Sequence, residues 1–251
     1  MDRSEIKNYR KNLKVSDRLI LSLDVPDKNM ALSVLSEAQD SVSCIKIGLE
    51  LIYNEGLEIV RAVKNCGFNI LLDAKLMDIP NTVSAALRGI CRLDVRMVTI
   101  HASGGASMLH NAVKTAAEES LKSNSIRPLI FAVTILTSLD DNDLKSIGYK
   151  DNFNSAVLNL AGVAVNSKVD GIICSPNEVR ALREKLGYDF LIATPGIRLE
   201  NDDTQDQKRV STPMKAISDG ADFVIAGRSI INSKNIKETI KIFNEQIESG
   251  L

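Results

Sequence analysis

The chain contains no tryptophan, and aromatic residues together make up only 4% of its 251 residues. Proteins that hold single-stranded nucleic acid commonly stack the bases on aromatic side chains, so this composition argues against that function. The formal net charge is −1, which provides no bulk electrostatic attraction toward nucleic acid or toward a membrane surface. We therefore expect no nucleic-acid partner and no membrane partner.

Long apolar runs are absent too. None approaches the roughly 20 residues that a membrane-spanning helix needs, and residues 1–18 lack the apolar segment of a secretory signal. The mixed charges of this N-terminal extension suggest a solvated segment or a short helix. The four cysteines, at positions 44, 66, 91 and 174, share no spacing typical of a metal site. We expect free, mostly buried thiols, a cytoplasmic location and no bound metal.

Eight short apolar runs recur along the chain, and each is nearly continuously apolar in its first half, as expected for strands covered on both faces. They span residues 19–25, 44–49, 69–76, 97–102, 129–136, 171–176, 190–197 and 223–230. Segments with helical spacing of apolar residues lie between several of them. Two of these helical faces consist of Met30, Ala31, Val34, Leu35 and Ala38, and of Val83, Ala86, Leu87 and Ile90.

Eight alternating strand and helix units in about 250 residues predict a single α/β domain, a (β/α)8 TIM barrel. The barrel should occupy residues 19–251 and follow the extension of residues 1–18. An open, doubly wound sheet is the alternative. In a TIM barrel the active site lies at the carboxyl ends of the strands, so the residues that end each run are the candidates for function.

Polar residues do gather at the ends of the eight runs. They include Asp24, Lys46, Asp73, Lys75, His101, Thr137, Ser175, Arg198 and Arg228. Residues two apart on a strand point to the same side, so Asp73 and Lys75 should face together, while Ala74 points toward the helices. With Lys46 on the neighbouring strand and Asp78 in the next loop, they form a candidate tetrad of two cations and two anions. A purely structural salt-bridge network is the alternative, although buried ion pairs stabilise poorly.

The loops after the seventh and eighth strands carry a second signal, because phosphate sites of TIM barrels recur there. Gly227 and Arg228 follow the eighth strand, and Arg198 follows the seventh. Glycine lets backbone amides approach an anion, and arginine offers a bidentate fork. Gln207, in the polar stretch after Arg198, adds a neutral donor. We expect a ligand with a phosphate at one end and its reacting atoms near Lys75.

The segment DAKLMDIPNT at residues 73–82 resembles the signature D-x-K-x-x-D-I-P-x-T of the orotidine 5'-monophosphate decarboxylase family. Other blocks resemble this family in the same order along the chain: LSLDV (21–25), KIGLEL (46–51), TIHASGG (99–105), VTILTS (133–138), CSPNE (174–178), TPGIR (194–198), DQKRV (206–210) and AGRSI (226–230). Ala74, Met77 and Ser229 depart from residues that are common in the family, but no charge of the tetrad is lost.

The resemblance implies a homodimeric barrel that converts orotidine 5'-monophosphate to uridine 5'-monophosphate and carbon dioxide without a cofactor. Loss of carbon dioxide leaves a carbanion at C6, which Lys75 would stabilise and then protonate, with Asp73 and Asp78 holding Lys75 in place. The remaining roles that the resemblance implies are ribose contacts for Asp24 and Lys46, a pyrimidine contact for Thr137, and phosphate and loop contacts for Arg198, Gln207, Gly227 and Arg228. Asp78, Ile79 and Thr82 would reach across the dimer into the partner's site.

Two other functions remain open for the same barrel. Magnesium-dependent sugar-phosphate decarboxylases resemble the chain less, and they place a metal-binding carboxylate on the second strand, about where Lys46 stands. An ammonium group cannot ligate a divalent cation, which argues against this alternative. A non-catalytic nucleotide-binding barrel would tolerate the loss of Lys75, which is present. A fusion to the preceding transferase of the pathway is not expected, because 18 residues are too few for such a domain.

Overall fold

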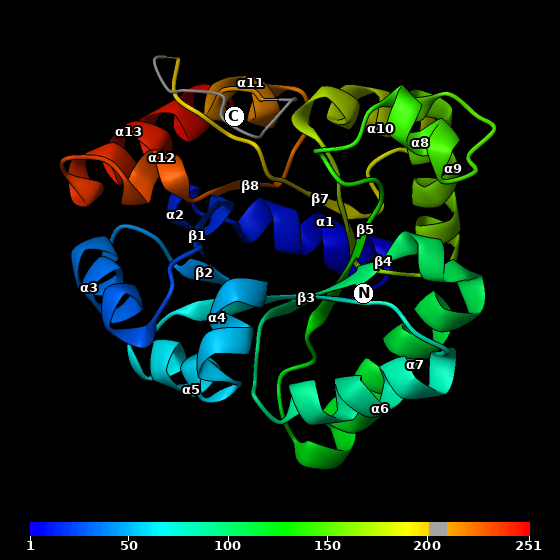
Figure 1. Ribbon diagram of the computed structural model, residues 1–251, viewed down its shortest axis with the longest axis horizontal. Helices are drawn as coiled ribbons and strands as arrows, with labels where there is room; N and C mark the ends of the chain where they lie inside the picture. The colour runs from blue at the N-terminus through cyan, green and yellow to red at the C-terminus, as the bar shows by residue number, and fades with distance from the viewer. Residues whose placement is uncertain (201–209) are drawn as a thin grey trace.

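A computed structural model describes residues 1–200 and 210–251 of the chain. Eight parallel strands close into one barrel in the order β1 to β8, with helices around it (Figure 1). The strands are β1 (Leu19–Leu23), β2 (Cys44–Ile47), β3 (Asn69–Leu76), β4 (Met97–His101), β5 (Leu129–Val133), β6 (Gly171–Ile173), β7 (Leu191–Thr194) and β8 (Phe223–Ala226). The predicted TIM barrel and all eight predicted strands are confirmed, and the open sheet is wrong.

The helices that follow the strands form the outer layer of the barrel. They are α3 (Lys28–Ala38), α4 (Leu49–Glu55), α5 (Glu58–Asn65), α6 (Pro80–Cys91), α7 (Gly105–Ser123), α8 (Asp141–Ser146), α9 (Phe153–Asn166), α10 (Val179–Leu186), α11 (Pro213–Ser218), α12 (Arg228–Ile231) and α13 (Ile236–Ser249). Short 3-10 turns at Ala102–Gly104 and Pro176–Glu178 precede α7 and α10. Among the described residues, no helix combines the length and the apolar character that crossing a bilayer requires.

The predicted helix faces are buried with two exceptions. Met30 is 47% exposed, because the buried stripe of α3 starts at Ala31 and successive residues are about 100° apart around a helix. Ala86 is also exposed. It lies between the positions of the buried stripe of α6, and Ser84 is buried instead.

The apolar core has two parts, one between the strands and the helices and one inside the barrel. Along β1, Leu19, Leu21 and Leu23 belong to the outer part, while Ile20 belongs to the inner part. This alternation follows from the period of two along a strand. It also directs Ser22 into the barrel, where it lines a cavity at the carboxyl end of the strands.

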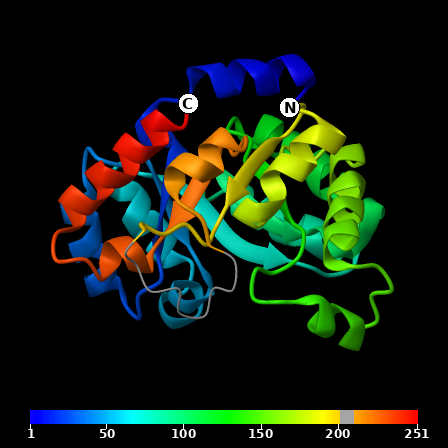
Figure 2. The same ribbon diagram turned by 90° about the horizontal axis from the view of Figure 1, so that it is seen from above.

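The N-terminal extension forms two helices, α1 (Arg3–Asn12) and α2 (Val15–Arg18). Figure 2 shows α1 lying across one end of the barrel. Ile6 is only 1% exposed and joins the inner core, with Tyr9 packed beside it. The extension is therefore helical, which is closer to the expected short helix than to a solvated segment, and α1 packs against the barrel.

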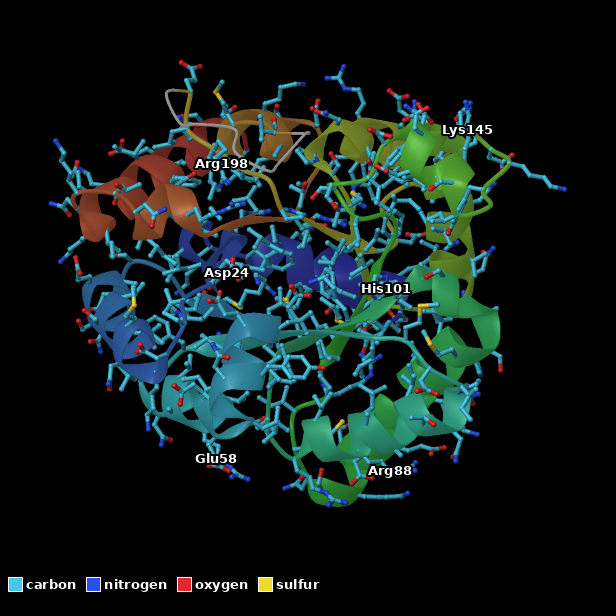
Figure 3. The ribbon with its side chains drawn as sticks, viewed as in Figure 1. Asp24, Glu58, Arg88, His101, Lys145 and Arg198 are labelled. Carbon is cyan, nitrogen blue, oxygen red and sulfur yellow. The ribbon has the colours of Figure 1, made fainter. Side chains whose placement is uncertain are left out.

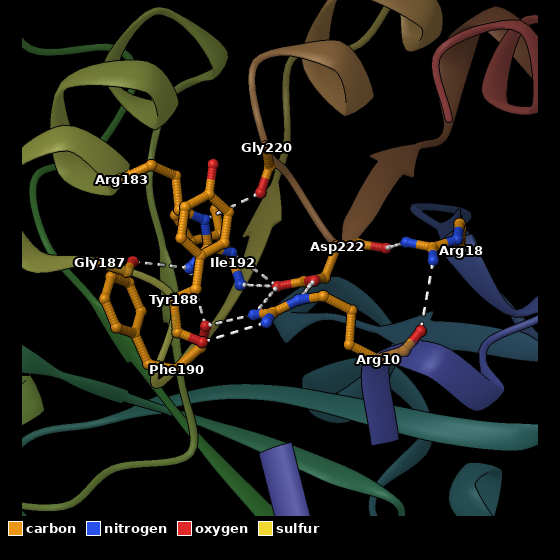
Figure 4. A network of polar contacts seen from close by, with 9 residues as sticks. All are labelled: Arg10, Arg18, Arg183, Gly187, Tyr188, Phe190, Ile192, Gly220 and Asp222. Carbon is orange, nitrogen blue, oxygen red and sulfur yellow. Dashed lines mark hydrogen bonds and ion pairs between the residues drawn. The ribbon is translucent and has the colours of Figure 1, made fainter. Parts of the chain in front are cut away.

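Buried charges attach α1 to the base of the barrel (Figure 4). Asp222, which is 2% exposed and immediately precedes β8, accepts hydrogen bonds from the guanidinium groups of Arg10 and Arg183 and from the Ile192 amide. The backbone carbonyl of Asp222 accepts a further bond from Arg18 at 3.3 Å. Because Arg10 belongs to α1 and Arg18 to α2, both N-terminal helices are bonded to the strand that closes the barrel.

Candidate active site

A cavity of about 220 Å³ opens at the carboxyl ends of the strands, and every one of the eight strands or the loop after it contributes to its lining. Charged and polar groups come from the ends of β1 to β4 and from the loops after β7 and β8. Aliphatic side chains such as Val133, Ile135 and Ile173 form an apolar wall on β5 and β6. Asp24 and Arg198, which both line the cavity, are labelled in Figure 3.

Four charged side chains form a continuous series of contacts in this cavity. The Nζ atom of Lys46 lies 3.0 Å from Oδ1 of Asp24 and 3.5 Å from Oδ2 of Asp73. The Nζ atom of Lys75 lies 2.7 Å from the same oxygen of Asp73. Cations and anions alternate, so each ammonium contacts a carboxylate. Three of these residues belong to the predicted tetrad, and Asp24 stands where the prediction had Asp78.

The register of the strands explains why these side chains meet. Lys46 is the pairing partner of Ser22 on β1 and of Leu71 on β3. Asp24 comes two residues after Ser22, and Asp73 comes two residues after Leu71. Residues two apart on a strand share a face, so both carboxylates point into the barrel, closer to its carboxyl end than Ser22 and Leu71. The long side chain of Lys46 bridges them from the strand between.

Lys75 reaches the cavity through an irregular backbone. The ladder between β3 and β4 pairs Leu72 with Val98 and Leu76 with Ile100, so four steps on β3 match two steps on β4. Within this bulge Lys75 has a φ of 48°, a left-handed conformation that is strained for a residue with a side chain. The prediction that Asp73 and Lys75 share a face holds, since both line the cavity.

Asp73 is the buried centre of the cluster, with 8% of its surface exposed. Burial alone raises the pKa of Asp73, but the nearby Lys46 and Lys75 ammonium groups and hydrogen bonds from Lys75 and Thr99 outweigh it, so the pKa lies below its ordinary value. Asp73 is therefore ionised at neutral pH. The Asp73 carboxylate thus places a fixed negative charge beside Lys75.

The loops after β7 and β8 also contribute to the lining of the cavity. Arg198 is 8% exposed, and its guanidinium lies 3.3 Å from the hydroxyl of Ser229. A Cβ atom on Gly227 would lie 3.0 Å from the carbonyl oxygen of Ser22, so a side chain there would crowd β1. Arg228 and Thr137 also line the cavity. Gln207 lies outside the described residues.

Asp78, Ile79 and Thr82 do not reach the cavity described for their own chain. The Asp78 side chain is exposed, and its carboxylate accepts the amide hydrogen of Ile79 at 2.6 Å. Ile79 is 67% exposed, and Met77 nearby is 56% exposed. Thr82, in the first turn of α6, is exposed as well. Within one chain, the tetrad with Asp78 is therefore not assembled.

Sequence reasoning missed Ser22, Gly48 and Thr99. Ser22 donates a hydrogen bond to Asp24 at 2.7 Å, and Thr99 donates one to Asp73 at 2.8 Å. The available signal was a polar residue inside an apolar strand, on the inward side. A Cβ atom on Gly48 would lie 2.8 Å from Nζ of Lys46, so a side chain there would displace the Lys46 ammonium.

Similarity to known proteins covers nearly the whole chain. The orotidine 5'-phosphate decarboxylase of Carboxydothermus hydrogenoformans is 41% identical over 237 residues, which cover 94% of this chain and 98% of that protein. The protein of the same name from Bacillus mycoides is 41% identical over 235 residues, covering 93% and 98%.

Solved structures and family profiles agree with these relatives. The crystal structure of orotidine 5'-phosphate decarboxylase from Lactobacillus acidophilus has a TM-score of 0.82 and 32% sequence identity, and the match covers 92% of this chain and 99% of that one. A sequence profile matches residues 17–243. The chain thus belongs to the orotidine 5'-phosphate decarboxylase / HUMPS family.

Proposed function

We propose that the protein is a carboxy-lyase that converts orotidine 5'-monophosphate to uridine 5'-monophosphate and carbon dioxide, the last step of de novo pyrimidine synthesis. The observation that carries this proposal is the alternating series Asp24, Lys46, Asp73 and Lys75 in one cavity, which Arg198 and Arg228 also line. Relatives with 41% identity that carry this name support it.

The charges suit the chemistry of this decarboxylation. When the bond from C6 to the carboxylate breaks, the electron pair stays on C6 in an orbital in the ring plane, which the ring π system cannot delocalise. The Lys75 ammonium stabilises this carbanion and then transfers a proton to C6, and solvent returns a proton to the lysine. Asp73 pairs with the Lys75 ammonium at 2.7 Å and holds it in position.

A magnitude shows how much one cation contributes. Two unit charges about 4 Å apart interact by about 4 kcal/mol at an effective dielectric constant near 20. This equals roughly three decades of rate. The rest of the acceleration must come from the preorganised site and from binding energy at the phosphate. We assign the phosphate to Arg198, Gln207, Gly227 and Arg228, the ribose to Asp24 and Lys46, and the pyrimidine to Thr137.

We also propose a homodimer in which Asp78, Ile79 and Thr82 complete the partner's site. Asp78 carries a charge that the mechanism needs near Lys75, yet its side chain is exposed in its own chain. Met77 and Ile79 beside it are large apolar side chains that are more than half exposed. A charged residue flanked by exposed apolar residues fits a surface that a second copy covers in a two-fold interface.

The reaction is proposed to need no metal. The Lys46 ammonium lies between the carboxylates of Asp24 and Asp73, where a divalent cation would otherwise find its ligands. This position of Lys46 favours the decarboxylation of a nucleotide over the magnesium-dependent sugar-phosphate reaction. We assign the enzyme to the cytoplasm, since its four cysteines are free thiols.

One assay tests the function directly. The purified protein should consume orotidine 5'-monophosphate in the presence of EDTA, followed by the loss of substrate absorbance and by the release of carbon dioxide. Lys75→Ala is the matched control and should be nearly inactive while remaining folded. Turnover that disappears in EDTA and returns with magnesium would favour the metal-dependent alternative, and a folded protein that never consumes the nucleotide would disprove the proposal.

A further inference from the structure

Thr99 on β4 contacts both of the charged residues at the centre of the cavity. Its side chain is completely buried, with 0% exposed. The hydroxyl donates a hydrogen bond to Oδ1 of Asp73 at 2.8 Å and accepts one from the backbone amide of Lys75 at 3.0 Å. One hydroxyl group therefore connects the carboxylate that pairs with Lys75 to the backbone of Lys75 itself.

The two carboxylate oxygens of Asp73 have different partners. Both lysine contacts, from Lys46 and Lys75, go to Oδ2, whereas Oδ1 receives the hydroxyl of Thr99. Lysine side chains are long and flexible, so they fix the direction of a carboxylate poorly. Threonine is β-branched and restricted at χ1, and here it extends from a regular strand. The Thr99 hydroxyl thus holds the plane of the Asp73 carboxylate.

The bond to Lys75 acts on the irregular part of β3. The bulge interrupts the regular ladder between Leu72 and Leu76, and the Lys75 amide bonds to a side-chain oxygen there. A buried amide must have a partner, and the left-handed φ of 48° persists only if surrounding contacts hold it. The same hydroxyl provides a partner at the residue where the backbone is strained.

We propose that Thr99 is a positioning residue for the decarboxylation, whose hydroxyl orients the Asp73 carboxylate and the backbone of Lys75 and so aims the Lys75 ammonium at the reacting carbon. Thr99 acts through these two residues. This inference rests on the proposed function of the cavity. It adds a requirement for one hydroxyl group at a position that is otherwise enclosed in the barrel.

Two pairs of proteins isolate the hydroxyl. Thr99→Val differs from the wild type by the hydroxyl while keeping the shape of the side chain. Thr99→Ala and Thr99→Ser both lack the methyl group of threonine, and they differ from each other only by the hydroxyl. In each pair the protein without the hydroxyl should lose about 10- to 100-fold in kcat, because a small misplacement of a catalytic group has effects of this size. Affinity for uridine 5'-monophosphate, measured by calorimetry, should stay within about threefold, since the Thr99 hydroxyl bonds to Asp73 and Lys75 and the phosphate is assigned to other residues.

The outcomes separate a positioning role from a structural one. Equal kcat values within both pairs overturn the inference. The inference is also overturned if kcat, Tm and nucleotide affinity fall together in all variants, including Thr99→Ser, because that is the pattern of a general packing defect. If Thr99→Val does not fold, the serine and alanine variants give the same comparison, and if no hydroxyl-free variant folds, the role is structural. Wild-type and Lys75→Ala assays keep the proposed function separate: if wild type turns over nucleotide and Lys75→Ala does not, only the role of Thr99 is at stake.

Discussion

The Nζ atom of Lys46 lies 3.0 Å from Asp24 and 3.5 Å from Asp73, so one ammonium on β2 pairs with a carboxylate just after β1 and with another within β3. The side chain of Lys46 is only 12% exposed, which weakens screening by solvent and salt. Lys46 is the largest of the influences that lower the pKa of Asp73 against the effect of its burial.

This relationship predicts a change in pH dependence for Lys46→Met. Without the Lys46 charge, burial of Asp73 is opposed less, so the pKa of Asp73 should rise and the acid limb of kcat should move to higher pH. The lowered pKa in the wild type also contributes stability that is present above the ordinary carboxyl pKa and is lost as pH falls through the folded-state value. Profiles of kcat against pH for both proteins test the shift.

A matched control for this experiment is Lys64→Met. Lys64 also pairs with an aspartate, Asp94, but both side chains are partly exposed and neither lines the cavity. The acid limb of the kcat profile of Lys64→Met should coincide with that of the wild type. An unshifted limb in Lys46→Met would show that Lys46 does not govern the ionisation of Asp73.

How far the sequence predicts this site depends on the range of the contacts. Asp73 and Lys75 could be paired from the period of two along one strand. The contact of Lys46 with Asp24 required the register between β1 and β2, which a list of strands does not contain. The contacts of Thr99 could not be predicted for a similar reason. Its hydroxyl bonds to residues at the bulge in β3, and no residue type in that segment indicates a bulge.

The fold shows the same division. Eight apolar runs predicted eight strands, because a strand covered on both faces is apolar by local necessity. The docking of α1 was not predicted, since Ile6 is a lone apolar residue among charges and its helix is held by Asp222, more than 200 residues further along the chain. Local sequence patterns therefore predict the strands and helices, whereas ion pairs between residues far apart in the sequence form only in the completed barrel.

Arg228→Ala should weaken orotidine 5'-monophosphate strongly while hardly changing the slow turnover of a substrate that lacks the phosphate. Arg228 follows β8 and lines the cavity, and a hydrogen bond to a charged group contributes about 1.5–3 kcal/mol. The ratio of kcat/KM for the two substrates, in variant and wild type, measures this contribution. An equal loss for both substrates would contradict the assignment of Arg228 to the phosphate.

Arg10→Ala should destabilise the barrel from the end opposite the active site. The variant removes one partner of Asp222, which is 2% exposed, but leaves Arg183 in place, so we expect a loss of about 1.5–3 kcal/mol. A change of this size lowers the Tm of a protein of this length by roughly 3–12 °C. The value of kcat at 25 °C should remain unchanged, because α1 lies away from the cavity.

The control for Arg10 is Arg3→Ala, also in α1. Arg3 pairs with Asp189, but the two side chains are 84% and 45% exposed, and exposed ion pairs contribute little. Its Tm should match that of the wild type. If both variants lower the Tm equally, the helix itself rather than the Asp222 network would be responsible.

The proposed sharing of sites between two chains predicts that two inactive variants restore each other. Lys75→Ala and Asp78→Ala should each be nearly inactive alone. After mixing, dissociation and reassembly, a hybrid dimer has one site with both lesions and one site with neither, provided that Asp78 serves the partner. Random equal mixing makes about half of the dimers hybrid, so about a quarter of wild-type activity should return. If Asp78 serves its own chain, every hybrid site keeps one lesion and no activity returns. A reassembled sample that mass spectrometry shows to be hybrid, yet that stays at the level of the single variants, would rule out the shared site.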